Sequence, residues 1–250
     1  VLTADVSTTG GADPCEEVIT IMWDVTDCDG NSLVAPDEQI FTIQDMAEPT
    51  GASTLADVGP IDACLADALT ATEASSSVAS EIAQLEIDYI DDCTTVTATN
   101  TGDVVDAGGT DCSWSVTRTY TVEDGCGNFV AGPITVTHTG GDVTPPTGTN
   151  NLADAGPIDA CLVDALTATE TASPTASEIA TLESDYSDNC GAAVTATQTS
   201  EVVDAGGTDC SWSVTRTYTV EDACGNFAAG TITVTHTGGD VTPPTGTSTL

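Results

Sequence analysis

Residues 110–124 read TDCSWSVTRTYTVED, and residues 208–222 read the same fifteen letters. In the first copy, one set of alternate positions holds cysteine, tryptophan, valine, arginine and tyrosine, and the other holds serine and threonine. A period of two is typical of a β-strand with one buried face and one face in water. The stretch therefore predicts a strand that the chain builds twice.

The repetition extends well beyond this strand. Residues 134–149 and 232–247 both read ITVTHTGGDVTPPTGT. Matched cysteines recur 97 or 98 positions apart, in the pairs Cys64 and Cys161, Cys93 and Cys190, Cys112 and Cys210, and Cys126 and Cys224. Self-similarity at a fixed long period indicates a tandem array, and about 100 residues is an ordinary domain size. We predict full repeats at 49–146 and 147–244.

The remaining residues resemble parts of a repeat. Residues 1–48 match the C-terminal half of a diverged repeat, with Cys15 at the position of Cys112 and Cys28 near that of Cys126. Residues 245–250 match the start of the next repeat. We therefore expect the chain to be a segment of a longer protein.

Other patterns define the rest of each repeat. Residues 65–72, 94–105 and 134–139 predict further strands, and the sequence DAGGT at 106–110 predicts a turn. A helix is predicted next, because apolar residues recur every three or four positions at Val78, Ile82, Leu85 and Tyr89. In the second copy, Ser173 as N-cap and Pro174 as the first helical residue would start the same helix. The expected fold class is all-β, with tandem immunoglobulin-like β-sandwich repeats that each carry a short helical insert and two disulfides.

Charge excludes several kinds of partner. The chain has 40 Asp and Glu residues, two Arg and no Lys, which gives a formal net charge of -38. Nucleic acids and anionic lipid surfaces need a positive partner, so binding to either is not expected. The chain also lacks a run of 18 apolar residues, so no membrane span is predicted in this segment.

Ten cysteines at matched positions indicate an oxidising compartment. The CxxC pairs typical of structural zinc sites do not occur. Structural disulfides are expected in secreted and cell-surface proteins, so we predict an extracellular location.

Strand geometry suggests which cysteines pair. A straight strand from Cys112 to Val122 is about 33 Å long, too far for Cys112 to bond Cys126, because bonded cysteines have Cα atoms about 5.5 Å apart. Folding the hairpin around Gly108 would bring Cys93 near Cys126. The predicted pairs are Cys93–Cys126, Cys64–Cys112, Cys190–Cys224 and Cys161–Cys210. Cys15 and Cys28 either lack partners in this segment or bond each other.

One longer run of residues resembles a known family. DNC at 188–190, VTRTYTVEDACGN at 214–226 and the following VTPPT are similar to the hyalin-repeat-like (HYR-like) four-cysteine immunoglobulin-like modules of Bacteroidetes surface adhesins, including gliding-motility adhesins. The resemblance covers both full repeats and, more faintly, residues 1–48. It implies export to the cell surface and a filamentous or adhesive role, without catalytic residues. The strong acidity, the helical insert and DCDGN at 27–31 depart from the pattern, so adhesive partners are not carried over.

Acidic residues near the cysteines predict a calcium site. Chain direction places Asp142 at the end of one repeat, facing Asp188 and Asp222 of the next. Carboxylates in flexible loops suit Ca²⁺, and the alternative is a set of solvated surface charges. The candidate ligands are Asp91, Asp92, Glu123, Asp124, Asp142, Asp188, Glu221 and Asp222. A weaker candidate is the EF-hand-like loop that begins at Asp27, where Ser32 stands in place of the required glycine.

The few basic side chains favour structural roles. Arg118 and Arg216 lie on the apolar face of the predicted strand, where a buried arginine must pair with a carboxylate. His138 and His236 are expected to be strand residues, because neither has a second histidine or free cysteine beside it. Serine, histidine and aspartate occur without a nucleophile-elbow motif, so an enzyme is not expected.

These patterns predict a structural or adhesive repeat segment of a large secreted bacterial surface protein, which forms an extended stalk or filament. Its partners would be other repeats of the same protein. One alternative is an adhesin module that binds a glycan or a surface protein. Another is a filament subunit that assembles laterally, since an edge of the half repeat could be completed by another chain.

Overall fold

The computed structural model describes residues 2–10, 15–32 and 37–246. The chain forms two compact units. Unit 1 holds residues 1–61, 67–108 and 114–139, and unit 2 holds 62–66, 109–113 and 140–250. Unit 2 thus includes two short segments from the sequence repeat at 49–146. Part of the predicted restart, residues 247–250, lies outside the described residues.

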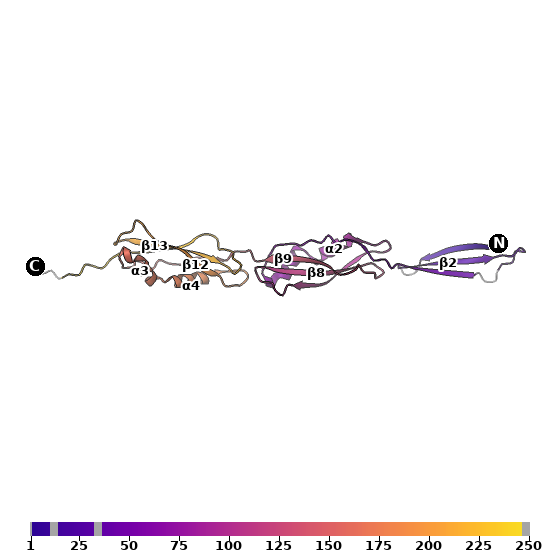
Figure 1. Cartoon of the computed structure of the whole chain (residues 1–250), viewed down its shortest axis with the longest axis horizontal. Coiled ribbons are helices and arrows are strands. Elements are labelled where there is room, and N and C mark those ends of the chain that lie inside the picture. The colour runs from indigo at the N-terminus through magenta and orange to yellow at the C-terminus, as the bar shows by residue number, and fades with distance from the viewer. Residues whose placement is uncertain (1, 11–14, 33–36, 247–250) are drawn as a thin grey trace. The chain divides into compact units, whose positions relative to one another are not determined.

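The N-terminal part of unit 1 is a three-stranded antiparallel sheet in the order β1-β2-β3, drawn in indigo in Figure 1. Its strands are β1 (Leu2–Gly10), β2 (Glu16–Val25) and β3 (Asp37–Gln44). That residues 1–48 are the C-terminal half of a diverged repeat stays a prediction.

The two full sequence repeats contain nearly the same elements in the same order. The first has β4 (Thr50–Gly51), β5 (Ile61–Asp62), the 3₁₀ turn η1 (Leu65–Asp67), α1 (Ala68–Ser75), α2 (Val78–Asp88), β6 (Tyr89–Ile90), β7 (Thr97–Val105), β8 (Trp114–Glu123) and β9 (Ile134–Gly141). The second has β10 (Thr147–Gly148), η2 (Leu162–Asp164), α3 (Ala165–Ala172), α4 (Thr175–Asp185), β11 (Tyr186–Ser187), β12 (Thr195–Val203), β13 (Trp212–Glu221) and β14 (Ile232–Gly238).

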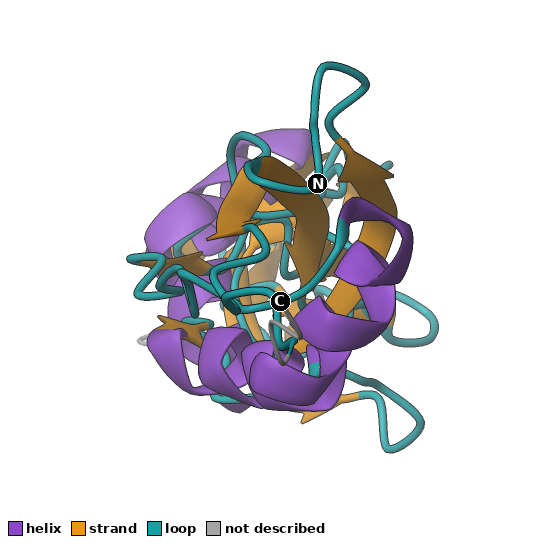
Figure 2. Ribbon diagram, turned by 90° about the vertical axis from the view of Figure 1, so that its left-hand side faces the viewer, coloured by secondary structure: helices purple, strands orange, loops and turns teal. Residues whose placement is uncertain are grey.

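The chain is mostly β, as predicted, and its longer strands pair antiparallel. Four strands form a sheet in the order β5-β9-β8-β7, and three form a sheet in the order β12-β13-β14. Two-residue strands pair separately, β4 with β6 and β10 with β11. Helices pack on one side of these sheets, α1 and α2 against β7 and β8, and α3 and α4 against β12 and β13. Figure 2 shows the helices outside the strands. The immunoglobulin-like sandwich stays a prediction.

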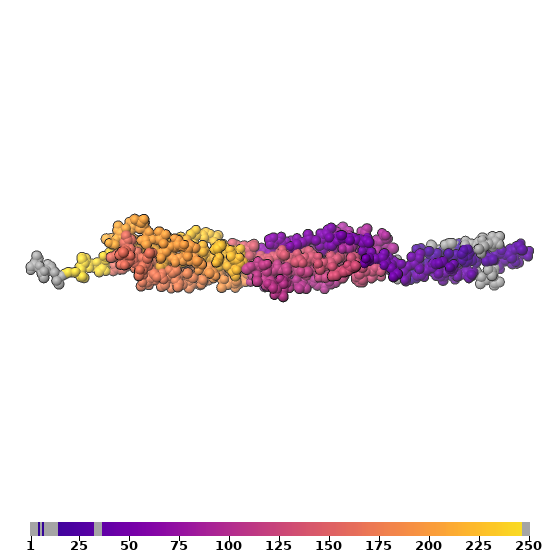
Figure 3. Space-filling view, viewed as in Figure 1, coloured from indigo at the N-terminus to yellow at the C-terminus, as the bar shows by residue number. Residues whose placement is uncertain are grey.

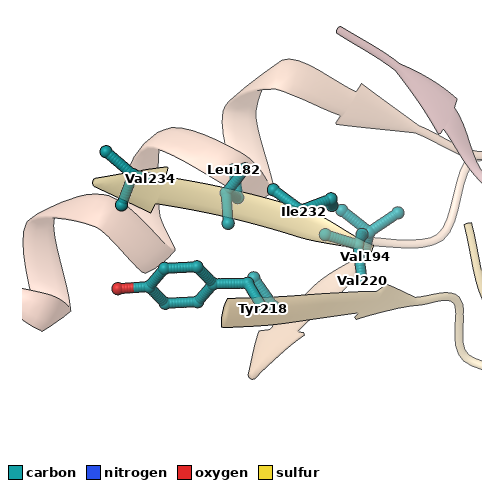
Figure 4. Packing of buried hydrophobic residues seen from close by; sticks show 7 residues of the cluster. Leu182, Val194, Tyr218, Val220, Ile232 and Val234 are labelled. Carbon is teal, nitrogen blue, oxygen red and sulfur yellow. The ribbon is translucent and has the colours of Figure 1, made fainter. Parts of the chain in front are cut away.

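The core follows from the alternation quoted at the outset. Strands β8 and β13 bury every second residue from Trp114 and Trp212 onward, and the residues between them are only half-buried. In unit 2 the buried face of β13 packs with Leu182 of α4 and with Ile232 and Val234 of β14 (Figure 4). Helix α4 buries Leu182 and Glu178, and its other residues are partly or fully exposed (Figure 3, orange).

The strand predicted at residues 65–72 is wrong. The structure has η1 and the start of α1 there, and in the second repeat it has η2 and α3. Ala68 and Thr72, four positions apart, are the buried residues of α1, and this spacing belongs to one face of a helix. Each full repeat therefore carries two helices, where the sequence predicted one.

The helix predicted near residue 78 is confirmed as α2. In the second repeat the predicted helix start is wrong by one residue. Pro174 is the N-cap and the helix begins at Thr175, while the carbonyl of Ser173 accepts from Arg216.

The predicted disulfide pairing is also wrong. The bonds are Cys15–Cys126, Cys64–Cys190 and Cys112–Cys224, with Cα atoms 5.3, 5.2 and 5.0 Å apart. Cys28, Cys93, Cys161 and Cys210 are free and exposed. The prediction assumed that each repeat closes on itself, whereas every bond joins a cysteine of one sequence repeat to a cysteine of the next. Cys112 does not bond Cys126, as the strand length required.

Candidate functional site

Two groups of carboxylates lie beside disulfide-bonded cysteines. In unit 1, oxygens of Asp45, Asp91 and Asp124 lie within 4.8 Å of one another; we call this acidic group 1. In unit 2, Asp142 and Asp188 meet within the same distance, and the charge of Asp222 acts on Asp142. We call these three residues acidic group 2. The juxtaposition of Asp142 with Asp188 and Asp222 is the arrangement expected from chain direction.

The two groups occupy equivalent positions in the sequence. Asp45 and Asp142 are 97 residues apart, as are Asp91 and Asp188, and Asp124 and Asp222 are 98 apart. Asp45 was missed because residues 1–48 have diverged, although the 97-residue period itself could have identified it.

Turn geometry positions the acidic side chains. Asp124 follows β8 and accepts the N–H groups of Cys126 and Asn128 on one oxygen and the Asn128 amide on the other. Gly127 completes this turn at φ +84°, a conformation that favours glycine. Asp222 makes the same contacts with Cys224 and Asn226. Because the cysteine lies inside the turn, the turn fixes both the carboxylate and the cross-link.

Some carboxylate oxygens in these groups are buried without a partner. They are Asp45 Oδ2, Asp142 Oδ2 and Asp188 Oδ1. The Asp142 residue is only 4% exposed, and its other oxygen accepts the N–H of Thr144. Burial raises the pKa of Asp142, and the negative charges of Asp188 and Asp222 also raise it. Ionised Asp142 therefore destabilises the fold as pH rises through this pKa, unless a positive charge offsets it.

Three predicted ligands lie in neither group among the described residues. Asp92 is exposed. Glu123 and Glu221 end strands β8 and β13, where each bridges to a phenylalanine, Phe129 or Phe227. They were predicted because assumed Cys93–Cys126 and Cys190–Cys224 bonds would have gathered them at one end of each repeat, and neither bond forms.

The EF-hand-like loop at Asp27 is a turn between strands. Asp27 accepts the N–H groups of Asp29 and Asn31, and its second oxygen accepts the Asn31 amide. This is the same turn that follows β8 and β13. These contacts lower the pKa of Asp27, chiefly through Asn31.

Arg118 and Arg216 are buried and paired with carboxylates, as expected of arginines on the apolar face of a strand. Arg118 lies 2.7 Å from Glu73 and 3.1 Å from Glu81, and it donates to the carbonyl of Ser76 at 2.5 Å. Asp103 lies 3.6 Å from its Nε. In unit 2, Arg216 contacts Glu170, Glu178 and Glu201 in the same way.

The sequence did not indicate that one buried glutamate organises this cluster. Glu81 is 4% exposed and accepts from the hydroxyls of Tyr120 and Ser76 as well as from Arg118. Its Oε1 lies 3.0 Å from Nε2 of His138, whose Nδ1 accepts the N–H of Val58. His138 and His236 are thus buried strand residues, as predicted.

The cysteines follow one pairing rule. Cys15–Cys126 and Cys112–Cys224 are the same bond one repeat apart, since Cys15 matches Cys112 and Cys126 matches Cys224. By the same shift, Cys161 matches Cys64 and Cys210 matches Cys112. Cys64 and Cys112 each bond a cysteine of the following repeat. Cys93 and Cys28 match Cys190 and Cys126, which bond the preceding one. By this rule, Cys28, Cys93, Cys161 and Cys210 have no matched partner within residues 1–250.

The free thiols are held in an acidic environment. The negative charge of Asp45 raises the pKa of Cys93, as do burial and the charges of Asp91 and Asp92. Burial raises the pKa of Cys161, with Asp209 and Asp240 adding to the effect. A raised thiol pKa slows oxidation and exchange, because the thiolate is the reactive form.

No protein-family model matches this chain, and no curated protein matches it. Among solved structures, it is similar to the extracellular cadherin domains 1–5 of protocadherin gamma B2, at 9% identity and a TM-score of 0.24 over 96% of this chain. The chain spans about half of that structure, 52% of its length. Mouse protocadherin-24 EC1-3 is similar at 12% identity and a TM-score of 0.24, with 91% of this chain and 80% of that chain covered. Similarity this weak does not establish a shared fold.

Across the described residues, none of the helices has both the length and the apolar character needed to cross a membrane.

Proposed function

We propose that this chain is a structural, adhesion-type segment of a secreted surface protein, in which successive repeats are bonded covalently to one another. It would act as a stalk or filament that extends from a bacterial cell, without catalysis. The observation that carries the proposal is the pairing of Cys64 with Cys190 and of Cys112 with Cys224. Bonds from each repeat to the next support length and continuity rather than a single active site.

Three further observations support an extracellular structural role. Disulfides persist in oxidising compartments. The net charge of -38 keeps such a segment soluble and away from nucleic acid. The resemblance of residues 188–245 to HYR-like adhesin modules agrees with a surface location.

Disulfide mapping tests the proposal directly. Free thiols of the native chain are alkylated, and the protein is then cleaved with pepsin at acid pH, where thiol exchange is slow. Trypsin would be a poor choice, because the chain offers only Arg118 and Arg216 for cleavage. We expect peptides joined through Cys15–Cys126, Cys64–Cys190 and Cys112–Cys224, with the other four cysteines alkylated. Peptides joined through Cys64–Cys112 or Cys190–Cys224 would disprove the proposal.

A second candidate, a self-assembling filament subunit, is favoured by β3. This strand is an edge of its sheet, and all its residues are exposed, including Ile40 at 59% and Ile43 at 52%. Exposed edge strands pair readily with other chains. The mass of the native chain in solution separates the two candidates, since pairing at β3 would multiply it.

A further inference from the structure

We propose that acidic groups 1 and 2 are two divalent-cation sites that take Ca²⁺, each formed by carboxylates from successive sequence repeats. The proposal does not depend on how long the native protein is or on what it contacts. It rests on the positions of the carboxylates, on their partnerless oxygens and on the absence of another positive charge to neutralise them.

The carboxylates are closer together than unpaired charges favour. Asp45, Asp91 and Asp124 place three oxygens within 4.8 Å, and Asp142 and Asp188 place two at the same range. Like charges at such distances repel strongly where water is partly excluded. The chain nevertheless holds them there with turns and disulfides, at two positions one repeat apart.

The partnerless oxygens indicate what is missing. Asp142 is more than nine-tenths buried, and its Oδ2 has no hydrogen-bond donor in the described part of the chain. The matching Oδ2 of Asp45 is also buried without a donor, and so is Oδ1 of Asp188. A buried carboxylate oxygen without a partner is costly. A bound cation would satisfy these oxygens.

No side chain of the protein can supply this positive charge. The chain has no lysine. Arg118 and Arg216 are already held in the buried clusters with Glu81 and Glu178, and His138 and His236 lie in the same two clusters. The neutralising ion must therefore come from solution.

The donor chemistry favours calcium. Zinc prefers sulfur and nitrogen ligands, and the one cysteine near acidic group 2, Cys190, is already bonded to Cys64. Carboxylate oxygens suit hard cations, and Ca²⁺ accepts six to eight oxygens in irregular geometry, whereas Mg²⁺ requires a near-ideal octahedron. Water and backbone carbonyl groups can complete the coordination.

The chain contains its own matched control. Asp240 is 98 positions after Asp142, in an identical stretch of sequence. Its Oδ1 accepts the N–H of Thr242, as Oδ1 of Asp142 accepts that of Thr144. Within the described residues, however, Asp240 belongs to no carboxylate group and is exposed. Asp240→Asn removes the same charge from the same turn without touching a proposed site.

Calorimetric titration of Ca²⁺ into the full oxidised chain tests the proposal. The titration is done at about 0.15 M salt, where the Debye length is about 8 Å and diffuse attraction of Ca²⁺ to the acidic surface is largely screened. We expect two ions per chain for the natural sequence and for Asp240→Asn. One ion should bind to Asp142→Asn or to Asp45→Asn, and none to the double variant. Affinities in the range of extracellular modules, about 0.1–1 mM, are expected.

Melting temperatures separate loss of the site from loss of folding. In chelator, Asp142→Asn should melt at or above the temperature of the natural chain, because it removes a repelling charge. In calcium, its gain in melting temperature should be smaller than that of Asp240→Asn. Equal calcium binding by Asp142→Asn, Asp45→Asn and Asp240→Asn would overturn the proposal, as would the absence of saturable binding. Neither result would alter the disulfide map.

Discussion

At the scale of single residues, the informative feature is the buried cluster around each arginine. A buried ion pair adds little net stability when it is compared with a well-packed apolar core, but removing one partner costs about 3–5 kcal/mol. Glu178 contacts Arg216, Tyr218, Ser173 and His236. It therefore holds β13, β14 and the start of α4 together through one carboxylate.

We expect Glu178→Ala to destabilise unit 2 by about 3–5 kcal/mol, because Arg216 would lose its buried carboxylate partner. Urea unfolding followed by Trp212 fluorescence, with Trp23 and Trp114 replaced by Phe, measures this change in the free energy of unfolding. Ser184→Ala, an exposed change on the same helix, is the control and should change it by less than about 0.5 kcal/mol. A similar loss in both variants would contradict this role of Glu178.

At the scale of elements, the two matching helices start differently. The side chain of Ser77 accepts the N–H of Ser80 at 3.1 Å and caps α2. The matched residue before α4 is Pro174, which makes no side-chain cap. Proline restricts the unfolded chain, which stabilises a protein by about 0.4–1 kcal/mol at a compatible position. The two repeats thus begin the same helix through different physical effects of similar size.

Ser77→Ala should therefore destabilise unit 1 by about 1 kcal/mol through loss of the cap. Pro174→Ser should change unit 2 by much less, since the gained cap offsets the lost restriction of the unfolded chain. Urea unfolding of each variant measures both effects, with the exposed Ser75→Ala as a control. A loss of stability in Pro174→Ser as large as that in Ser77→Ala would show that serine does not cap α4.

Element types were predictable where one period dominated. Strand β8 and helix α2 have clear periods of two and of three to four residues, and both were predicted correctly. The stretch from Leu65 to Thr72 reads LADALTAT and follows neither period strictly, and its alanines and threonines are compatible with either structure. There the packing of Ala68 and Thr72 decided in favour of a helix.

At the scale of the whole molecule, one of the carboxylate encounters was predictable from the sequence, but the cross-links were not. Chain direction alone placed Asp142 beside Asp188. The bonding of Cys64 to Cys190 depends on how one repeat follows another, and periodicity within a repeat carries no information about that. The geometry within a repeat correctly excluded Cys112–Cys126, but it could not identify partners outside the repeat.

The pairing rule gives a prediction for a longer chain. If residue 250 is followed by a copy of residues 153–244, so that 245–250 supply the start of the added repeat, Cys161 and Cys210 should become protected from alkylation. Their new partners would be the added equivalents of Cys190 and Cys224. Alkylation followed by mass spectrometry measures this protection. Unchanged labelling of Cys161 and Cys210 would contradict the rule.

The placement of the cross-links also affects how the molecule tolerates damage. The backbone between Asp142 and Thr147 is bypassed by both Cys64–Cys190 and Cys112–Cys224. Cleavage of one peptide bond in that connector would leave the two pieces covalently attached. Severing the molecule at this position therefore requires a protease and a reductant together.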